Sequence, residues 1–243
     1  MLNSKTKRNL YFIVFVVLLV GLAMGIAKVV MTMSDSERLI VRDTGEGFDV
    51  SHHQGTIDWK QVAGTCSVSY VYIKATQGGS VQDDRYAYNV REAKKEGLLV
   101  GAYHFFHTNV SLDMQFRNMT SVIKREDIDL VPMIDVEPEG CPNCNSAELR
   151  QRLEKFMQMV ENYYGKKPML YTSVNFYNEH FSGSSLRNYP LMIAYYHGDE
   201  PQLSDGNRYA VWQYTHHGSI QGVPGDVDRS RLMHGFALPH LAL

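Results

Sequence analysis

Near its middle the chain reads Leu130-Val131-Pro132-Met133-Ile134-Asp135-Val136-Glu137-Pro138-Glu139. An apolar run ends there in two acids, Asp135 and Glu137, with a single valine between them. Alternate residues of a strand share a face, so both carboxylates point the same way, about 6–7 Å apart at their Cα atoms. Pro138 then ends the strand, because it has no backbone N–H to donate. Burying carboxylates is costly unless a function uses them, which leaves three interpretations open: a metal site, a paired-acid hydrolase and a structural network.

Strand and helix patterns alternate from Gly45 onward. The segments that read as strands are 47–52, 68–76, 98–106, the acid-bearing stretch, 168–173, 191–196, 209–215 and one near 227–232. Helix patterns separate the first five of them, and the longest, at 147–164, has Asn145 and Glu148 as a capping pattern and Gly165 as its stop. A short helix through Phe176 and Phe181 follows the fifth strand. Eight strands alternating with helices predict an α/β fold built on a parallel, TIM-like barrel.

The last two connections are too polar and too rich in turn residues to hold packed helices. Residues 197–208 have no apolar period, and residues 216–225 contain three glycines and a proline. The domain is also shorter than the roughly 250 residues of a full barrel. We therefore predict a trimmed TIM-like barrel, (β/α)5(β)3, over residues 45–235, followed by a C-terminal tail at 236–243.

The N-terminus carries a membrane signal. A basic flank at residues 1–9 precedes an apolar run from Leu10 to Ala27, and 18 residues at about 1.5 Å each span about 27 Å, close to the hydrocarbon thickness of a bilayer. We predict a transmembrane signal-anchor at 10–31 and a linker at 32–44, with the N-terminus in the cytoplasm and the barrel outside it. A cleaved signal peptide is the alternative, and it also exports the barrel.

Composition narrows the possible partners. The chain has 24 basic and 26 acidic residues, a formal charge of −2, and no basic cluster in the sequence beyond the N-terminus, which argues against nucleic acid. The three cysteines are Cys66, Cys141 and Cys144. No second pair and no histidine lies at zinc-ligand spacing from Cys141 and Cys144, so in an oxidising compartment we expect a local disulfide between them, with Cys66 as a buried thiol.

Four acids are expected at one end of this barrel. In barrels of this kind the chemistry gathers at the C-terminal ends of the strands. Asp49 ends the first strand, Asp135 and Glu137 end the fourth, and Asp228 lies on the eighth. The first and eighth strands are neighbours in a closed barrel, so the four carboxylates converge.

Several motifs in order resemble glycoside hydrolase family 25, the Chalaropsis-type lysozymes. They are Gly47-Phe48-Asp49-Val50-Ser51-His52-His53-Gln54-Gly55, Tyr72-Ile73-Lys74-Ala75-Thr76-Gln77-Gly78, Gly101-Ala102-Tyr103-His104-Phe105-Phe106, Asp135-Val136-Glu137, Trp212-Gln213-Tyr214 and Val227-Asp228. The resemblance implies an N-acetylmuramidase on a trimmed barrel, with peptidoglycan glycan strands as its partner. The chain departs from the family pattern at Met192, where Trp is frequent, at Ser230, where Asn is common, and in its Cys141–Cys144 loop.

The resemblance, together with the chemistry of glycoside cleavage, assigns roles to the acids. Glu137 is the expected proton donor, its pKa raised by apolar walls and by Asp135. By resemblance, the 2-acetamido group of the substrate acts as internal nucleophile, with Asp135 orienting it and Asp49 and Asp228 tuning the pair. We expect Lys74 to pair with an acid in the barrel. No cofactor and no metal are expected. Aromatic residues expected to line the saccharide groove are Tyr103, Phe105, Tyr171, Tyr196 and Trp212.

Two alternatives of other classes remain. One is a metal-dependent hydrolase, since clustered carboxylates bind Mg²⁺ or Ca²⁺ and four histidines lie in or near the motifs: His52, His53, His104 and His107. The other is a non-catalytic, membrane-tethered module that binds peptidoglycan or acts as a scaffold.

Overall fold

A computed structural model describes Gly21, residues 44–142 and residues 145–243. The chain divides into two units, Met1–Val41 and Arg42–Leu243, and the description below concerns the second. No helix among the described residues has both the length and the apolar content needed to cross a bilayer. Apart from Gly21, the anchor predicted at 10–31 lies outside the described residues.

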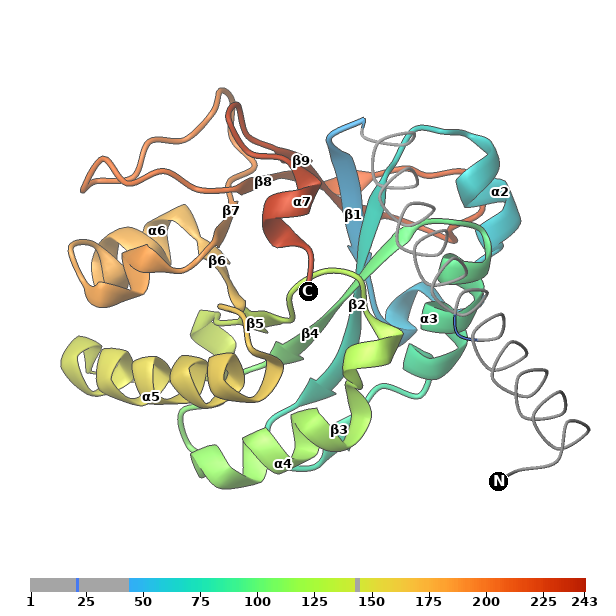
Figure 1. The fold of residues 1–243 in the computed structure, drawn as a ribbon. Helices are drawn as coiled ribbons and strands as arrows, with labels where there is room; N and C mark the ends of the chain where they lie inside the picture. Colours follow the sequence, from blue (N-terminus) through green and yellow to red (C-terminus); the bar gives the residue numbers. More distant parts are fainter. Residues whose placement is uncertain (1–20, 22–43, 143–144) are drawn as a thin grey trace, which may run out of the picture. The chain divides into compact units, whose positions relative to one another are not determined.

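The second unit is an α/β fold around an eight-stranded barrel (Figure 1). Its strands run in the order β1 (Glu46–Val50), β2 (Tyr70–Gln77), β4 (Leu99–Phe105), β5 (Met133–Asp135), β6 (Met169–Ser173), β7 (Leu191–Ala194), β8 (Val211–Gly218) and β9 (Val227–Leu232). β1 pairs with both β2 and β9, and this double pairing closes the barrel. A two-residue strand, β3 (Val81–Gln82), pairs only with the end of β2. All eight predicted strands are therefore present.

One strand runs against the others. β9 is antiparallel to both β8 and β1, whereas the neighbouring pairs from β1 through β8 are parallel. The prediction of a parallel barrel was wrong here. Residues 219–226 alone join β8 to β9, and so short a connection makes a hairpin, because a parallel crossover needs a dozen or more residues. The reversal places the beginning of β9 beside the C-terminal end of β1.

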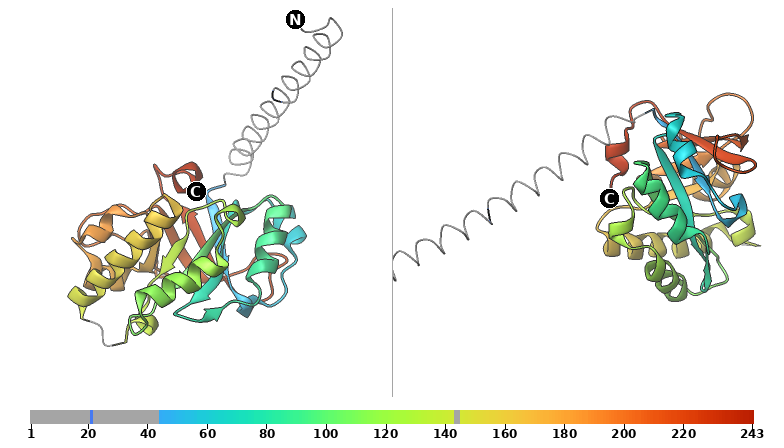
Figure 2. Two further views of the ribbon diagram at one scale, coloured as in Figure 1. Left: turned by 60° about the horizontal axis from the view of Figure 1, so that its bottom comes forward. Right: turned by 90° about the vertical axis from the view of Figure 1, so that its right-hand side faces the viewer.

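Helices cover the first half of the barrel (Figures 1 and 2). They are α2 (Trp59–Gly64), α3 (Tyr86–Lys95), α4 (Leu112–Val122) and α5 (Ser146–Tyr164), with α6 (Val174–Phe176) and a π-helical turn (Tyr177–Phe181) after β6. Asn145 caps α5 through bonds from the backbone N–H groups of Ala147 and Glu148, and Gly165 ends it in the left-handed region. As predicted, β7, β8 and β9 are joined by loops, and a short C-terminal helix, α7 (Leu238–Leu241), follows β9.

Large tyrosines fill the lower part of the barrel. Tyr70 and Tyr72 are fully buried, and their hydroxyls bond to Ser230 Oγ at 2.9 Å and to the Val131 carbonyl at 3.1 Å. Ser230, one of the departures from the family pattern, is thus a buried partner of a core tyrosine. Glycines make the room: a Cβ at Gly47 would lie 2.2 Å from the Tyr70 ring, and one at Gly101 2.2 Å from the Tyr72 ring.

The cysteine predictions have different outcomes. Cys66 is exposed, so the prediction of a buried thiol was wrong; it sits in the turn after α2 with φ of 50°, where the chain leaves the helix at the surface. Cys141 is buried. Cys144 lies outside the described residues, so the Cys141–Cys144 disulfide stays a prediction.

Gly47→Ala should lower the free energy of unfolding by about 1–3 kcal/mol, because the new methyl group overpacks the Tyr70 ring. Gly64→Ala is the matched control, since a Cβ at Gly64 meets nothing within 4 Å and lies in α2; it should be neutral or slightly stabilising. Denaturant midpoints measure both. Equal stability of the two variants would contradict this account of the barrel interior.

Candidate active site

A cleft of about 230 Å³ opens at the C-terminal ends of the parallel strands. Its lining includes all four predicted acids, Asp49, Asp135, Glu137 and Asp228. Burying several carboxylates in one small cavity raises their affinity for protons, because desolvation and mutual repulsion both disfavour the charged form. The structure therefore brings together the acids that the sequence placed on three different strands.

Asp49 and Asp228 form a pair across the closure of the barrel. They lie opposite each other in the β1–β9 register, and their carboxyl groups are hydrogen-bonded. Asp49 Oδ2 also accepts a bond of 2.7 Å from Gln213 Nε2. Burial, followed by the charge of Asp228, raises the pKa of Asp49 well above its usual value, and burial raises the pKa of Asp228. Two acids this close share a proton more readily than they both ionise.

Asp135 is the buried member of the central pair. It retains 7% of its exposure, and its Oδ1 atom has no hydrogen-bond partner among the described residues. Burial, and then the charge of Glu137, raise its pKa well above the usual range, while Lys74 acts in the opposite direction. A buried polar atom without a partner is costly in a folded protein. Within the described residues, Asp135 Oδ1 is therefore an acceptor open to a ligand.

Glu137 reaches the same cleft from just beyond β5. Its backbone is extended (φ −129°, ψ 162°) before Pro138 opens a 3₁₀ turn. The alternation expected from the sequence therefore holds at Glu137, although β5 itself ends at Asp135. Burial, and then the charge of Glu139, raise the pKa of Glu137, and a hydrogen bond with Tyr171 only partly offsets this rise. The charge effect was expected from Asp135, but the larger neighbouring charge is that of Glu139.

Lys74 supplies positive charge to the cleft and forms no ion pair with the residues that the structure describes. Its Nζ donates to Gln77 Oε1 at 2.9 Å and lies 5.3 Å from the centre of the Phe105 ring. The expected pairing with an acid is replaced by these contacts. The positive charge of Lys74 nevertheless makes the rise in pKa of Asp135 and Glu137 smaller than burial alone would give.

Three of the five predicted aromatic residues line the cleft: Tyr103, Phe105 and Tyr171. Tyr196 stands behind it, with its hydroxyl donating to Gln213 Oε1 at 2.6 Å. Trp212 is outside the cleft, on the opposite face of β8 from Gln213: its Nε1 donates to the Tyr195 carbonyl at 2.9 Å. Its place in the saccharide groove stays a prediction.

Gln213 is a site residue that was not predicted from the sequence. Its amide oxygen accepts bonds from the hydroxyls of Tyr171 and Tyr196 at 2.8 and 2.6 Å, while its NH₂ donates to Asp49. Gln213 is almost fully buried. It belongs to the Trp-Gln-Tyr motif, and strand alternation about the two aromatic residues was the signal that it faces inward.

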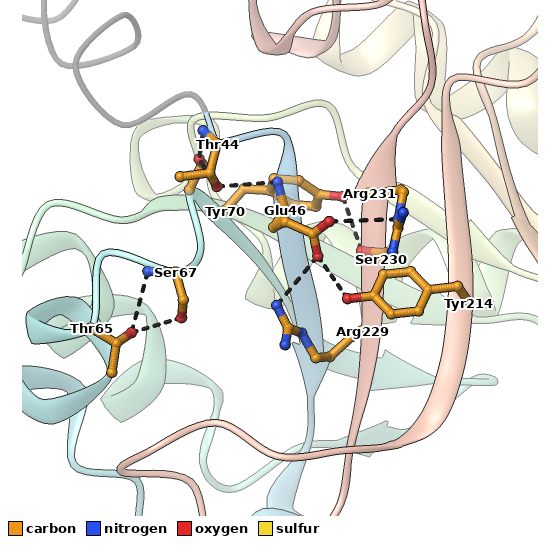
Figure 3. A network of polar contacts seen from close by, with 10 residues as sticks. Thr44, Glu46, Thr65, Ser67, Tyr70, Tyr214, Arg229, Ser230 and Arg231 are labelled. Atoms are coloured by element: carbon orange, nitrogen blue, oxygen red, sulfur yellow. Dashed lines mark hydrogen bonds and ion pairs between the residues drawn. The ribbon is translucent and has the colours of Figure 1, made fainter.

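On the outer face of the same strands a polar network holds the closure (Figure 3). Glu46 Oε2 accepts from the Tyr214 hydroxyl at 2.7 Å and pairs with Arg229 at 3.3 Å, while its Oε1 pairs with Arg231 at 3.5 Å. These residues come from β1, β8 and β9 and alternate with the inward acids. Arg231 also lies over the Tyr214 ring, 4.2 Å from its centre. The network fixes the register that sets Asp228 against Asp49.

The histidines that suggested a metal site make other contacts in the structure. His52 bonds to Asp83 at 2.9 Å, and His53 lines the cleft. His104 is buried between Thr76 and Gln115, and burial lowers its pKa to about 4. In the part of the chain that the structure describes, no group of three or more His, Cys, Asp or Glu side chains is arranged to hold a metal ion. The metal alternative finds no ligand set there.

Comparison with known proteins identifies relatives of this barrel. Residues 48–223 match glycosyl hydrolases family 25; the match includes Asp49, Asp135 and Glu137 and ends before Asp228. The chain is 34% identical to the uncharacterized protein YegX of Escherichia coli K12 over 76% of this chain and 68% of YegX. It is 30% identical to lysozyme M1 of Streptomyces globisporus over 82% of this chain and 70% of that protein. The crystal structure of the lysozyme from Streptomyces coelicolor superposes with a TM-score of 0.72 at 29% identity, covering 81% and 94% of the two chains.

Asp49→Asn should raise the free energy of unfolding at pH 7, because an amide accepts from Gln213 and donates to Asp228 without adding charge. A carboxyl with a raised pKa in the folded state contributes its stability fully below the unfolded pKa near 4, and this stability falls as pH rises toward the folded pKa. The advantage of the variant should therefore vanish near pH 4 and grow by about 1.4 kcal/mol per pH unit toward the folded pKa. Denaturant unfolding across pH measures it.

The matched control for this measurement is Asp84→Asn, which removes an exposed carboxyl outside the cleft. It should show no comparable gain at pH 7. A loss of stability at pH 7 in Asp49→Asn would contradict the shared-proton description of the Asp49–Asp228 pair.

Proposed function

Since the chain belongs to glycosyl hydrolases family 25 and is a glycoside hydrolase of the muramidase type, we propose that it cleaves the β-1,4 bond between N-acetylmuramic acid and N-acetylglucosamine in peptidoglycan. The relatives named as lysozymes support peptidoglycan as the substrate. One observation in the cleft carries the choice of mechanism: the unpartnered, buried Oδ1 of Asp135 beside a second acid, Glu137, with a raised pKa.

Glu137 is the proposed general acid. Its raised pKa keeps a proton available for the leaving glycosidic oxygen. In the second step the same group, now a carboxylate, takes a proton from the attacking water. Its partial exposure at the mouth of the cleft, beyond the end of β5, suits a group that meets both the leaving sugar and water.

Asp135 is the proposed partner of the 2-acetamido group of the substrate. Its open oxygen can accept the amide N–H and orient the carbonyl oxygen of that group toward the anomeric carbon. The carbonyl oxygen then displaces the leaving group, and the Asp135 charge stabilises the oxazolinium that forms. Water opens this ring from the opposite face, and two displacements at one carbon give net retention of the anomeric configuration.

Asp49, Asp228 and Gln213 are proposed to position the pair and limit its charge. If all four carboxyl groups ionised, their repulsion would oppose the negative charge that Asp135 needs. The proton held between Asp49 and Asp228, and the nearby ammonium of Lys74, reduce that repulsion. Gln213 connects this pair to Tyr171, which lines the cleft and bonds to Glu137.

We also propose that the barrel is tethered outside the cytoplasm by a single-pass anchor. The support is the sequence alone: Lys5, Lys7 and Arg8 precede the apolar run from Leu10 to Ala27. N-terminal sequencing of the mature chain tests this proposal. An intact N-terminus in the membrane fraction supports it, and a soluble chain beginning near Lys28 replaces it with a cleaved signal peptide.

The two central acids should respond differently to the leaving group. Glu137→Gln should lose about 10²–10⁴-fold in kcat/KM on peptidoglycan, and the loss should shrink on a substrate with an activated leaving group, because such a group departs without protonation. Asp135→Asn should be impaired on both substrates, since the oxazolinium forms whatever leaves. Assays of both variants on both substrates, with the first-formed anomer followed by NMR, make the measurement.

Asp84→Asn serves as the activity control, since its carboxyl lies outside the cleft. An inverted first product would refute neighbouring-group participation. Rescue of Asp135→Asn, and not of Glu137→Gln, by the activated substrate would mean that the two roles are exchanged. Binding of peptidoglycan by the wild-type chain without release of reducing ends would leave a non-catalytic binding module instead.

A further inference from the structure

A second pocket lies at the opposite end of the barrel from the cleft. Its volume is about 500 Å³. Its walls come from chain that enters parallel strands: Lys166 and Lys167 precede β6, Leu191 begins β7, and Ala210 precedes β8. We call it the basal pocket, because the catalytic acids gather where the same strands end.

The basal pocket is strongly basic in a chain of net charge −2. No Asp or Glu belongs to its lining, which includes four permanent cations and one histidine: Lys166, Lys167, Arg187, Arg208 and His240. All five side chains are exposed. The cluster is not apparent in the sequence, because these residues are spread from 166 to 240 and only the barrel brings them together.

Two of the cations, Lys167 and Arg208, are held in place by contacts that do not neutralise them. Lys167 Nζ donates to the Asn188 carbonyl at 3.0 Å and lies 5.3 Å from the Tyr189 ring centre. Arg208 donates to the His234 carbonyl at 2.7 Å and lies 5.1 Å from the Phe236 ring centre. Among residues 44–142 and 145–243, none of the four cations forms an ion pair with a carboxylate.

Two acids lie near this cluster: Glu161, which is hydrogen-bonded to Tyr189 of the lining, and Asp205. Burial raises the pKa of Asp205, but bonds from Gly183, Asn207 and Tyr177, together with the charge of Arg187, lower it overall. Asp205 is not part of the pocket lining, and its oxygens are already engaged by those donors. The positive charge of the basal pocket is thus left for an external anion.

The chemistry of the pocket fits a phosphodiester head group at a bilayer surface. Arginine presents a planar set of donors that matches phosphate oxygens, and lysine adds a point charge. Tyr189 and Phe236, both partly buried, stand beside the cations, and aromatic rings next to basic side chains are typical of membrane–water interfaces. Leu191 and Leu241 add an apolar floor.

The N-terminal segment joins the barrel at this same end. β1 begins at Glu46, and Gly45 accepts a bond of 2.7 Å from the N–H of Leu232, the last residue of β9. The predicted anchor ends at residue 31 and Thr44 is the first described residue of the barrel unit, so 12 residues, 32–43, lie between them. Such a linker spans at most about 43 Å, and a flexible one has an r.m.s. length of roughly 20 Å. The proposed tether therefore reaches the barrel at the end that carries the basal pocket.

We propose that the basal pocket docks on anionic phospholipid head groups of the membrane that holds the N-terminal segment, so that the catalytic cleft faces away from the bilayer. The proposal rests on the anchor proposed above, and it extends that proposal from attachment to orientation. With the base on the lipid surface, the cleft lies at the far end of the barrel and is open to a glycan strand outside the membrane.

Hydrogen exchange on the full-length chain in nanodiscs tests the docking. Discs containing about 30% phosphatidylglycerol should protect segments 186–191, 206–210 and 234–241, and discs of phosphatidylcholine alone should not, because each Lys or Arg near an anionic surface is worth roughly fivefold in affinity. The pocket variant Lys167→Gln/Arg187→Gln/Arg208→Gln should lose this protection, since three such factors compound to on the order of 100-fold. The charge-matched control is Lys60→Gln/Arg117→Gln/Lys155→Gln, three exposed cations outside the pocket; it should keep the protection.

Three results would overturn the proposal: equal protection on neutral discs, loss of protection in the control variant, or protection by inorganic phosphate alone in detergent, which would indicate a site for a free anion. Hydrolysis of solubilised peptidoglycan should be unchanged in the pocket variant, so a failure of the proposed enzyme activity is seen separately. If the chain does not co-purify with neutral discs, the anchor is wrong, and exchange with added anionic vesicles decides the pocket by itself.

Discussion

The pairing of Asp49 with Asp228 across β1 and β9 is the contact on which the rest of the site depends. It occurs where the barrel closes, between the first strand and the last. A carboxyl pair is a poor way to stabilise a closure, because both groups lose water and repel each other when ionised. The closure is held instead by groups around the pair: Gln213 beside it and the Glu46 network on the outer face. The fold thus stabilises an arrangement that its acids alone would oppose.

Strand positions and the four acids were predictable because their signals are local. Short strand-like segments were placed correctly for all eight strands, and simple alternation indicated that Asp135 and Glu137 share a face. Absence of apolar periodicity correctly indicated that β7, β8 and β9 are joined by loops. The acids could be placed at one end of the barrel because barrel geometry brings strand ends together.

The features that were missed depended on information that is not local. The direction of β9 follows from how eight residues turn between paired strands, which periodicity alone does not report. Trp212 and Gln213 are neighbours, and adjacent residues of a strand lie on opposite faces. Trp212 was predicted at the site, whereas the Gln213 amide is the group that contacts Asp49. Cys66 is apolar enough to be buried, but its turn lies at the surface. The basic cluster of the basal pocket was not predicted for the same reason, since Lys166 and Lys167, Arg187, Arg208 and His240 are about 20 or more residues apart from one another in the sequence.

The late position of β9 also orders events in the life of the chain. Asp49 belongs to the first strand and its partner Asp228 to the last, so their contact has a very large sequence separation, and such contacts form after local ones. A chain emerging from the ribosome can build α2 to α5 and most of the sheet while its fourth acid is still missing. The proton-sharing pair, and with it the charge balance around Asp135 and Glu137, then arises only when the final hairpin docks. Under the proposed mechanism, the set of four acids is complete only once this last hairpin has docked.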